Sequence, residues 1–426
     1  MGGVNRADGE GTDDGGDGTR SGAGVRGGGG GGVRAVAGGA NLLALRSHNT
    51  ALVLDLLRSA GTEGISRLEL AERTGLTPQA VSKITARLRA EGLAADAGRR
   101  ASTGGKPRTV LRLVPEAGHA VGVHLDRDEL RAVLVDLVGT VVGERRSPLD
   151  LGAGAPAVLE GVAGAAGELV AEVLGVPGGH TGGALGGHAA DVEGGRLAGV
   201  PTLLGLGVAL PGPLDHARGV LHRVTGFPEW DGFPLRDALT RRLGVPVVVD
   251  KDTNAAALGL AVAGEGGGEG GSFAYLHLGT GLGAGLVFGG AVHRGARTGA
   301  GEFGHQVVQL DGPPCTCGGR GCIEALCLGA VARGDLAEAA RVLGAGATNL
   351  AGLLDIDLVL LGGRTVAAAP DVFVSGVGAV LDARARREGG REGAVPVRIA
   401  PGGTRGVAQG AAQLLLAPLF GRGEGH

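Results

Sequence analysis

The segment Gly301-Glu302-Phe303-Gly304-His305, followed after nine residues by Cys315-Thr316-Cys317-Gly318-Gly319-Arg320-Gly321-Cys322-Ile323-Glu324, decides how this sequence is interpreted. Its cysteines have C-x-C-x4-C spacing, and His305 precedes the first of them by ten positions. Three thiolates and one imidazole form a ligand set typical of tetrahedral Zn²⁺. We therefore predict a structural zinc held by His305, Cys315, Cys317 and Cys322. The alternative is a group of free buried thiols beside an unrelated histidine.

The fourth cysteine, Cys327, is either a thiol of the hydrophobic core or a replacement for one of these ligands. With only four cysteines in 426 residues, the chain is no disulfide scaffold. It has no run of 18 apolar residues and no apolar signal segment near its start, so we expect a cytoplasmic protein without a membrane partner.

The overall composition predicts two or three domains. Glycine supplies 90 residues without a three-residue period, which excludes collagen, and 43% of the residues are apolar, enough for substantial cores. Residues 1–40 contain 17 glycines and few large apolar residues, so we expect a disordered tail there.

Residues 41–114 have the pattern of a winged helix-turn-helix. Ser66 and Glu69 form a capping box for a short helix that ends near Gly75, and Thr77-Pro78 begins another helix that runs to about Glu91. Two strands at 93–95 and 109–114 flank a polar loop, which is a plausible wing. The segment holds 12 Lys and Arg against 6 Asp and Glu, whereas the rest of the chain is acidic.

This basic block on an acidic body predicts double-stranded operator DNA as a partner. The alternative is a solvated helical face that happens to be basic. In the DNA-binding interpretation the helix beginning at Thr77 enters the major groove. Base contacts are expected from Gln79, Ala80, Ser82 and Lys83, and phosphate or minor-groove contacts from Arg87, Arg99, Arg100, Lys106 and Arg108.

From residue 115 onward, strands alternate with helices, which predicts an α/β layered fold. We expect a first lobe over 115–250 and a second over 251–426 that includes the zinc loop. The final helix, near 406–416, is expected to pack back on the first lobe.

These motifs resemble the ROK family (repressors, open reading frames and sugar kinases) over about residues 45–420. The resemblance rests on the segment quoted first and on VVVDKDTN at 247–254, FPEWDGFP at 227–234 and LVLLGG at 358–363. The winged helix, with STGGKP at 102–107, looks like the repressor branch. The resemblance implies an actin/hexokinase-like (ribonuclease H-like) fold, a sugar bound between the lobes, and a homodimer or higher oligomer.

The resemblance also implies site residues. Asp252 falls where family kinases keep the carboxylate that deprotonates the sugar hydroxyl, and Glu302, His305 and Glu324 fall where the family contacts sugar hydroxyls. Carboxylates accept strong hydrogen bonds from hydroxyl groups, which makes the assignment chemically sound. The alternative is that these residues are surface acids.

Three departures from the family pattern affect the chemistry. Kinases of the family bind ATP with a D-x-G-G-T turn, but residues 124–128 read His-Leu-Asp-Arg-Asp, and two carboxylates there would repel phosphates. The Gly-rich loop 279–285 is intact as a pattern but is weak evidence in so glycine-rich a chain. Lys251 and Gly226 replace two asparagines of the family, and Lys251 is expected either to pair with Asp252 or to receive an anionic group of the sugar.

Together these observations predict a sugar-responsive transcriptional regulator, most simply a repressor of carbohydrate genes, whose effector is a sugar or sugar phosphate. The kinase-like body is expected to be a non-catalytic sensor, with ATP and Mg²⁺ not bound. The alternative is an ATP-dependent sugar kinase with a DNA-binding appendage, in which Asp252 is the general base. A third possibility is a regulator that does not respond to sugar.

Overall fold

The computed structural model describes residues 48–100, 108–175, 197, 199–200, 202–224, 226–267, 271–389 and 394–422. The predicted tail 1–40, Lys106 and the STGGKP segment lie outside the described residues. No helix in the described part is both long and apolar enough to span a bilayer.

The first elements form a winged helix-turn-helix. They are α1 (His48–Ser59), β1 (Ile65–Ser66), α2 (Arg67–Thr74), α3 (Pro78–Ala90), β2 (Ala94–Arg100) and β3 (Arg108–Leu113), with the strands in the antiparallel order β1-β3-β2. The predicted capping box is confirmed, since the Glu69 amide donates to Ser66 Oγ and the Ser66 amide donates to Glu69 Oε2. Thr77 caps α3 by accepting the Ala80 amide, as its position before Pro78 predicts.

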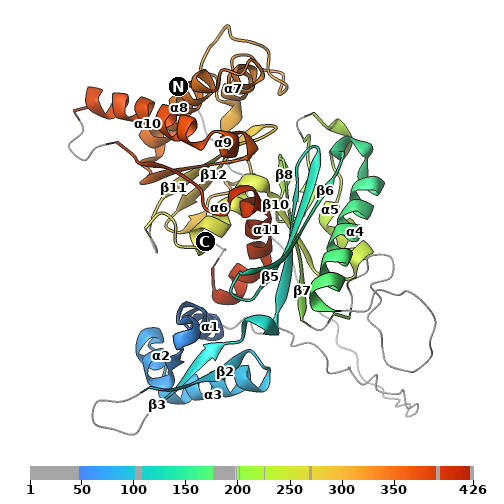
Figure 1. Ribbon diagram of the computed structural model, residues 1–426, viewed down its shortest axis with the longest axis vertical. Coiled ribbons are helices and arrows are strands. Elements are labelled where there is room, and N and C mark those ends of the chain that lie inside the picture. Colours follow the sequence, from blue (N-terminus) through green and yellow to red (C-terminus); the bar gives the residue numbers. More distant parts are fainter. Residues whose placement is uncertain are drawn as a thin grey trace, which may run out of the picture. The chain divides into compact units, whose positions relative to one another are not determined.

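A five-stranded sheet follows, in the order β10-β7-β4-β5-β6. Strands β4 (His119–Leu125), β7 (Leu203–Leu210) and β10 (Val247–Lys251) are parallel, and β5 (Glu129–Asp136) and β6 (Val141–Pro148) extend the sheet as an antiparallel meander. Helices α4 (Ala155–Leu174) and α5 (Leu235–Leu243) pack on one face of this sheet (Figure 1).

A second five-stranded sheet repeats this topology in the order β13-β12-β11-β14-β15. Its strands are β11 (Phe273–Leu278), β12 (Leu282–Phe288), β13 (Ala291–Val292), β14 (Leu358–Gly362) and β15 (Val397–Ile399), of which β11, β14 and β15 are parallel. Its outer face packs against α7 (Ile323–Ala332), α8 (Leu336–Leu354) and α10 (Pro370–Arg387), and the short α9 (Arg364–Ala368) follows β14. Two sheets with the same strand connections confirm the predicted actin/hexokinase-like fold.

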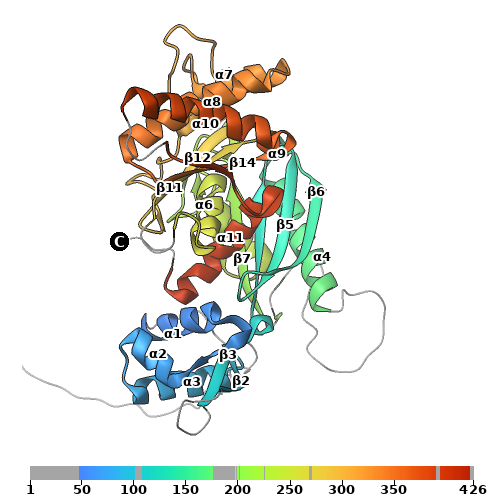
Figure 2. The same ribbon diagram turned by 60° about the vertical axis from the view of Figure 1, so that its left-hand side comes forward.

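Helices α6 (Asp252–Val262) and α11 (Gly406–Leu416) pack against each other between the two sheets (Figure 2). Glycine makes this packing close. A Cβ added at Gly207 of β7 would lie 1.8 Å from the Ala411 carbonyl oxygen, and one added at Gly410 would lie 1.9 Å from the Ala255 carbonyl oxygen. Because any side chain would clash with backbone there, α11 is fixed simultaneously against the first sheet and against α6.

A segment that follows α11 packs on the DNA-binding part. After α11, a short 3-10 turn η9 (Ala417–Phe420) contacts α1, and the Arg422 guanidinium donates two hydrogen bonds to Asp55, at 3.1 and 2.9 Å. The Arg58 guanidinium lies 5.0 Å from the centre of the Phe420 ring. Residues of α1, β5 and η9 therefore share one hydrophobic core.

Candidate functional site

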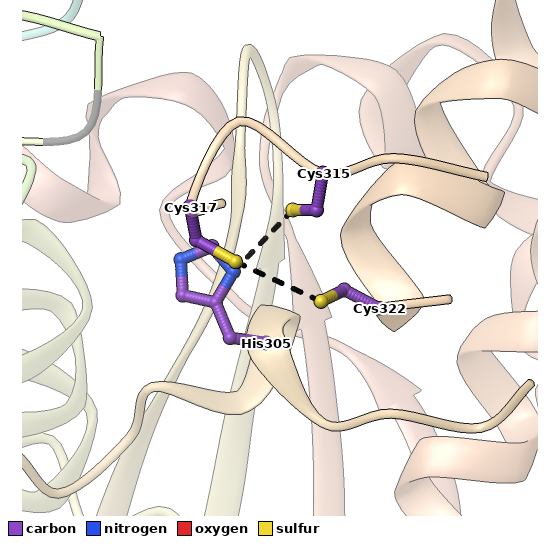
Figure 3. A group of neighbouring side chains, drawn as sticks. All are labelled: His305, Cys315, Cys317 and Cys322. Atoms are coloured by element: carbon purple, nitrogen blue, oxygen red, sulfur yellow. Dashed lines mark hydrogen bonds between the residues drawn. The ribbon is translucent and has the colours of Figure 1, made fainter. Parts of the chain in front are cut away.

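The predicted metal ligands are brought together by the loop that precedes α7. The ligand atoms of His305, Cys315, Cys317 and Cys322 all lie within 4.8 Å of one another, and their side chains converge on one point (Figure 3). The distance from Cys317 Sγ to Cys322 Sγ is 3.8 Å and that from Cys315 Sγ to His305 Nδ1 is 3.7 Å. Ligands at zinc–sulfur distances of about 2.3 Å in a tetrahedron would lie about 3.8 Å apart, so this group could hold a metal ion.

The loop geometry explains the C-x-C-x4-C spacing. Gly318 and Gly321 have φ of +92° and +65°, a backbone conformation that glycine adopts readily. The Gly319 amide donates to Cys317 Sγ, and this hydrogen bond lowers the pKa of that thiol. Cys327 lies elsewhere: its side chain is fully buried in the core of the second sheet, its thiol donates to the Ala339 carbonyl, and burial raises its pKa to about 12.

The predicted sugar-contacting residues line a single pocket. Asp252 is the first residue of α6, Glu302 and His305 flank a short 3-10 turn after β13, and Glu324 lies in the first turn of α7. The same pocket is lined by residues from the turns β4–β5 and β11–β12, so both sheets contribute to it. Residues from three separate segments of the sequence, at 252, 302–305 and 324, are thus brought to one place.

Each carboxylate of this pocket has a defined partner. Glu324 is buried and accepts the Leu282 amide at 2.9 Å, and Asp252 accepts the Thr253 amide at 2.7 Å. Glu302 is 41% exposed and accepts a hydrogen bond of 3.1 Å from Lys251. The predicted pairing of Lys251 with Asp252 is therefore wrong: the buried ammonium group lies on Glu302 and the Ala300 carbonyl instead.

A buried polar network, which the sequence analysis missed, fixes the segment that carries Glu302. Asp250 at the end of β10 is almost fully buried; it accepts Arg294 Nε at 2.7 Å and Asn254 Nδ2 at 3.0 Å. The Thr298 hydroxyl pairs with His216 at 3.0 Å. A buried carboxylate stays charged only when it is paired in this way, so the network holds the loop between residues 294 and 302 against the first sheet.

The β4–β5 turn is tied to the second sheet. Thr280 donates to Asp126 at 2.6 Å, and Arg364, directly after β14, donates two hydrogen bonds to Asp128 at 2.7 and 3.0 Å. Arg364 also lies 3.3 Å from Asp126. Although burial alone would raise it, the pKa of Asp126 is lowered by the Thr280 hydrogen bond and by nearby positive groups. Arg364 thus pairs with both carboxylates and offsets one of their two negative charges, and we call the set of Asp126, Asp128, Thr280 and Arg364 the Arg364 clamp.

The predicted DNA-contacting residues occupy one side of α3 and the start of β3. Gln79, Ser82, Lys83 and Arg87 are exposed, as are Thr77 and Arg108. Ala80, also expected to contact bases, is half-buried. Arg87 is held by Glu91 at 2.9 Å within the helix, whereas no ion pair involves Lys83 within the described residues. The side chains of Arg99 and Arg100, like the whole of Lys106, lie outside what the structure describes.

The fold and the site together define a winged helix-turn-helix protein with a duplicated α/β body and a Cys/His group beside an acidic pocket. The sequence pattern of the ROK family matches residues 197–335, and that described as winged helix-turn-helix DNA-binding matches residues 52–94. The chain belongs to the ROK family and carries an N-terminal winged helix-turn-helix.

Two relatives that this chain resembles are named as regulators. The DNA-binding transcriptional dual regulator NagC of Escherichia coli is 30% identical over 288 residues, which are 67% of this chain and 64% of NagC. The xylose repressor of Bacillus subtilis is 27% identical over 261 residues, 61% of each chain. The chain thus spans less than two thirds of the length of these relatives.

Among solved structures, a ROK family transcriptional regulator described as a homologue of the E. coli MLC protein matches with a TM-score of 0.66. The match covers 88% of this chain and 97% of that one. At 19% identity, this likeness shows the fold alone.

Proposed function

We propose that the protein is a sugar-responsive transcriptional regulator, most simply a repressor of carbohydrate genes, acting in the cytoplasm as a homodimer or higher oligomer. The observation that carries the proposal is the convergence of Asp252, Glu302, His305 and Glu324 on one pocket in a chain that begins with a DNA-binding fold. Carboxylates spaced around a pocket suit a ligand with several hydroxyl groups.

In this proposal the winged helices of two subunits place α3 in successive major grooves of operator DNA. A sugar bound between the two sheets alters the angle between them and thereby the spacing of the two recognition helices. This is a coupling free energy between two sites, so DNA must weaken or strengthen sugar binding by the same factor. Repression follows if the sugar-bound form is the poorer DNA binder.

We propose further that the body does not catalyse phosphoryl transfer. ATP binding in an actin-like fold needs backbone N–H groups open to the phosphates at the first turn. In this chain Asp126, Asp128 and Arg364 fill that turn with side chains that satisfy one another. The kinase alternative is favoured by one observation, namely that Asp252 lines the sugar pocket, where a general base would be needed.

The Cys/His group supports a structural zinc. His305, Cys315, Cys317 and Cys322 would hold the ion, and four protein ligands leave no open position for substrate. The ion would supply a rigid cross-link for the loop between Glu302 and Glu324. Its role in sugar recognition is therefore indirect, through the position of those two carboxylates.

The deciding experiment measures binding of the purified protein to a duplex selected from a random DNA pool, with and without a panel of aldoses and their phosphates. Lys83→Ala is expected to weaken DNA binding by about 1–3 kcal/mol and leave sugar affinity unchanged. Arg333→Ala, which removes an exposed cation after α7, is the control. Unchanged DNA affinity of the Lys83 variant would exclude α3 as the reading helix. ATP-dependent sugar phosphorylation that Asp252→Asn abolishes would establish the kinase alternative.

A further inference from the structure

Arg127 occupies an unexpected position in the effector pocket. It belongs to the β4–β5 turn and lines the same pocket as Asp252 and Glu302. Its guanidinium carbon lies 5.8 Å from the centre of the Phe227 ring. A Cβ added at Gly226 would lie 3.6 Å from Arg127 Nη1, and one added at Gly281 would lie 3.7 Å from Nη2.

These contacts place the guanidinium between a loop of the first sheet and the β11–β12 turn of the second. Packing beside an aromatic ring restricts the guanidinium at the wall of the pocket.

Arg127 is half-buried, and none of the ion pairs between described residues includes it. The other cations nearby are occupied, since Lys251 pairs with Glu302 and Arg364 with Asp126 and Asp128. A half-buried guanidinium without an acidic partner among the described residues has donors left for a ligand. Its planar set of donors fits the two oxygens of a carboxylate or phosphate.

The acids of the pocket do not supply that partner. Asp126 is bound by Thr280 and Arg364, Glu302 by Lys251, and Glu324 by the Leu282 amide. Asp252 accepts the Thr253 amide and has no ion pair within the described residues, so it suits a hydroxyl donor of the sugar. The lining therefore offers an acceptor for a hydroxyl from Asp252 and a bidentate donor for an oxyanion from Arg127.

We propose that Arg127 is a specificity-determining residue that contacts the effector directly, and that the effector is a sugar carrying a carboxylate or a phosphate. The proposal rests on the proposed effector function of this pocket and adds the chemical class of the ligand. Arg127 selects the charged sugar over its neutral parent by donating two hydrogen bonds to the oxyanion.

The test uses isothermal titration of the full-length protein with three compounds for each of glucose, galactose and mannose: the neutral sugar, its uronate and its 6-phosphate. One charged class is expected to bind at least about tenfold more tightly than its neutral parent. Arg127→Gln is expected to remove that preference and to change the affinity for the neutral sugar less than about twofold. Arg127→Lys keeps the positive charge but lacks the planar set of donors. Its preference for the charged sugar is expected to lie between those of wild type and Arg127→Gln.

Arg223→Gln is the matched control, because Arg223 is exposed and pairs only loosely with Asp231, at 3.7 Å. Melting temperature and metal content of each variant show that it is folded. A wild-type protein that prefers neutral sugars, or an Arg127→Gln variant that binds all three compounds like wild type, would overturn the inference. If neutral sugars alone bind and shift DNA affinity, the proposed function stands and this inference fails. If no compound binds, both fail.

Discussion

Replacing Arg364 should weaken effector binding, although Arg364 is not one of the predicted sugar-contacting residues. The clamp joins the first sheet to the second across the pocket, through Asp126 and Asp128. In Arg364→Gln the two carboxylates lose their cation, and the arrangement in which both sheets enclose the pocket loses stability. The variant keeps the predicted sugar-contacting residues intact, so any change in sugar affinity reports on closure.

The size of the expected effect follows from how exposed the Asp126 and Asp128 side chains are to solvent. Asp128 is 61% exposed, so its pair with Arg364 contributes at most about 1 kcal/mol. The Asp126 side chain is only 15% exposed and keeps its Thr280 hydrogen bond, so losing the cation there costs about another 1 kcal/mol. We call the arrangement in which both sheets enclose the pocket closed, and the separated arrangement open. A total of about 1–2 kcal/mol changes the ratio of closed to open protein by about 5–30-fold, and this factor is the upper limit of the change in apparent Kd.

Titration calorimetry with the effector found in the sugar panel measures this change, at low and at high salt. Arg398→Gln is the control, because Arg398 pairs with Glu265 at 2.9 Å without spanning the pocket. We expect a weaker effector affinity in Arg364→Gln, a smaller difference between the two proteins at high salt, and wild-type behaviour in the control. An Arg364→Gln protein with wild-type affinity at low salt would refute the view that these ion pairs stabilise closure.

Three further predictions concern metal, pH and packing. Cys317→Ser should lose the zinc that elemental analysis is expected to find in wild type, and Cys327→Ala should keep it; equal metal content in both variants would disprove the ligand assignment. Burial lowers the pKa of His124 in the folded protein. As the pH falls, this histidine therefore takes up a proton at a higher pH in the unfolded state than in the folded state. Urea titrations should therefore show stability falling as pH drops below about 6.5, by at most about 1.4 kcal/mol per pH unit, and His124→Asn should reduce that slope; an unchanged slope would contradict the assignment. Gly410→Ala should destabilise the protein by about 1–3 kcal/mol by clashing with the Ala255 carbonyl, whereas Gly378→Ala on α10, with open space around it, should be neutral or stabilising, and thermal melts that do not separate the two would count against the close packing of α11.

Much of the fold was predictable because its signals are local. The capping box at Ser66, the Thr77-Pro78 helix start and the alternating apolar strands act within a few residues, and the structure has the elements they predict. Helices α8 and α10 were not predicted, because glycines interrupt their patterns. The structure explains those glycines by packing: a Cβ at Gly344 would lie 2.9 Å from Val380, and one at Gly376 would lie 2.6 Å from Ala340.

The site was predictable only in part, for the same reason. The C-x-C-x4-C spacing is a local motif, and the structure brings its ligands together. Contacts of Arg364 with Asp128 join positions 236 residues apart, and no local pattern announces such a pair. The predicted electrostatic picture of the β4–β5 turn was therefore incomplete. The two acids are evident in the sequence, whereas their pairing with Arg364 depends on the position of the second sheet.

The Asp55–Arg422 contact bears on how such proteins can be re-engineered. Because residues of η9 complete the hydrophobic core that contains α1, the winged helix-turn-helix packs with a segment that follows the whole α/β body in the sequence. A chimaera joined at a single point after β3 would separate Phe420 from Arg58 and Arg422 from Asp55. Exchanging the α/β body between relatives would thus require two splice points, one on each side of it.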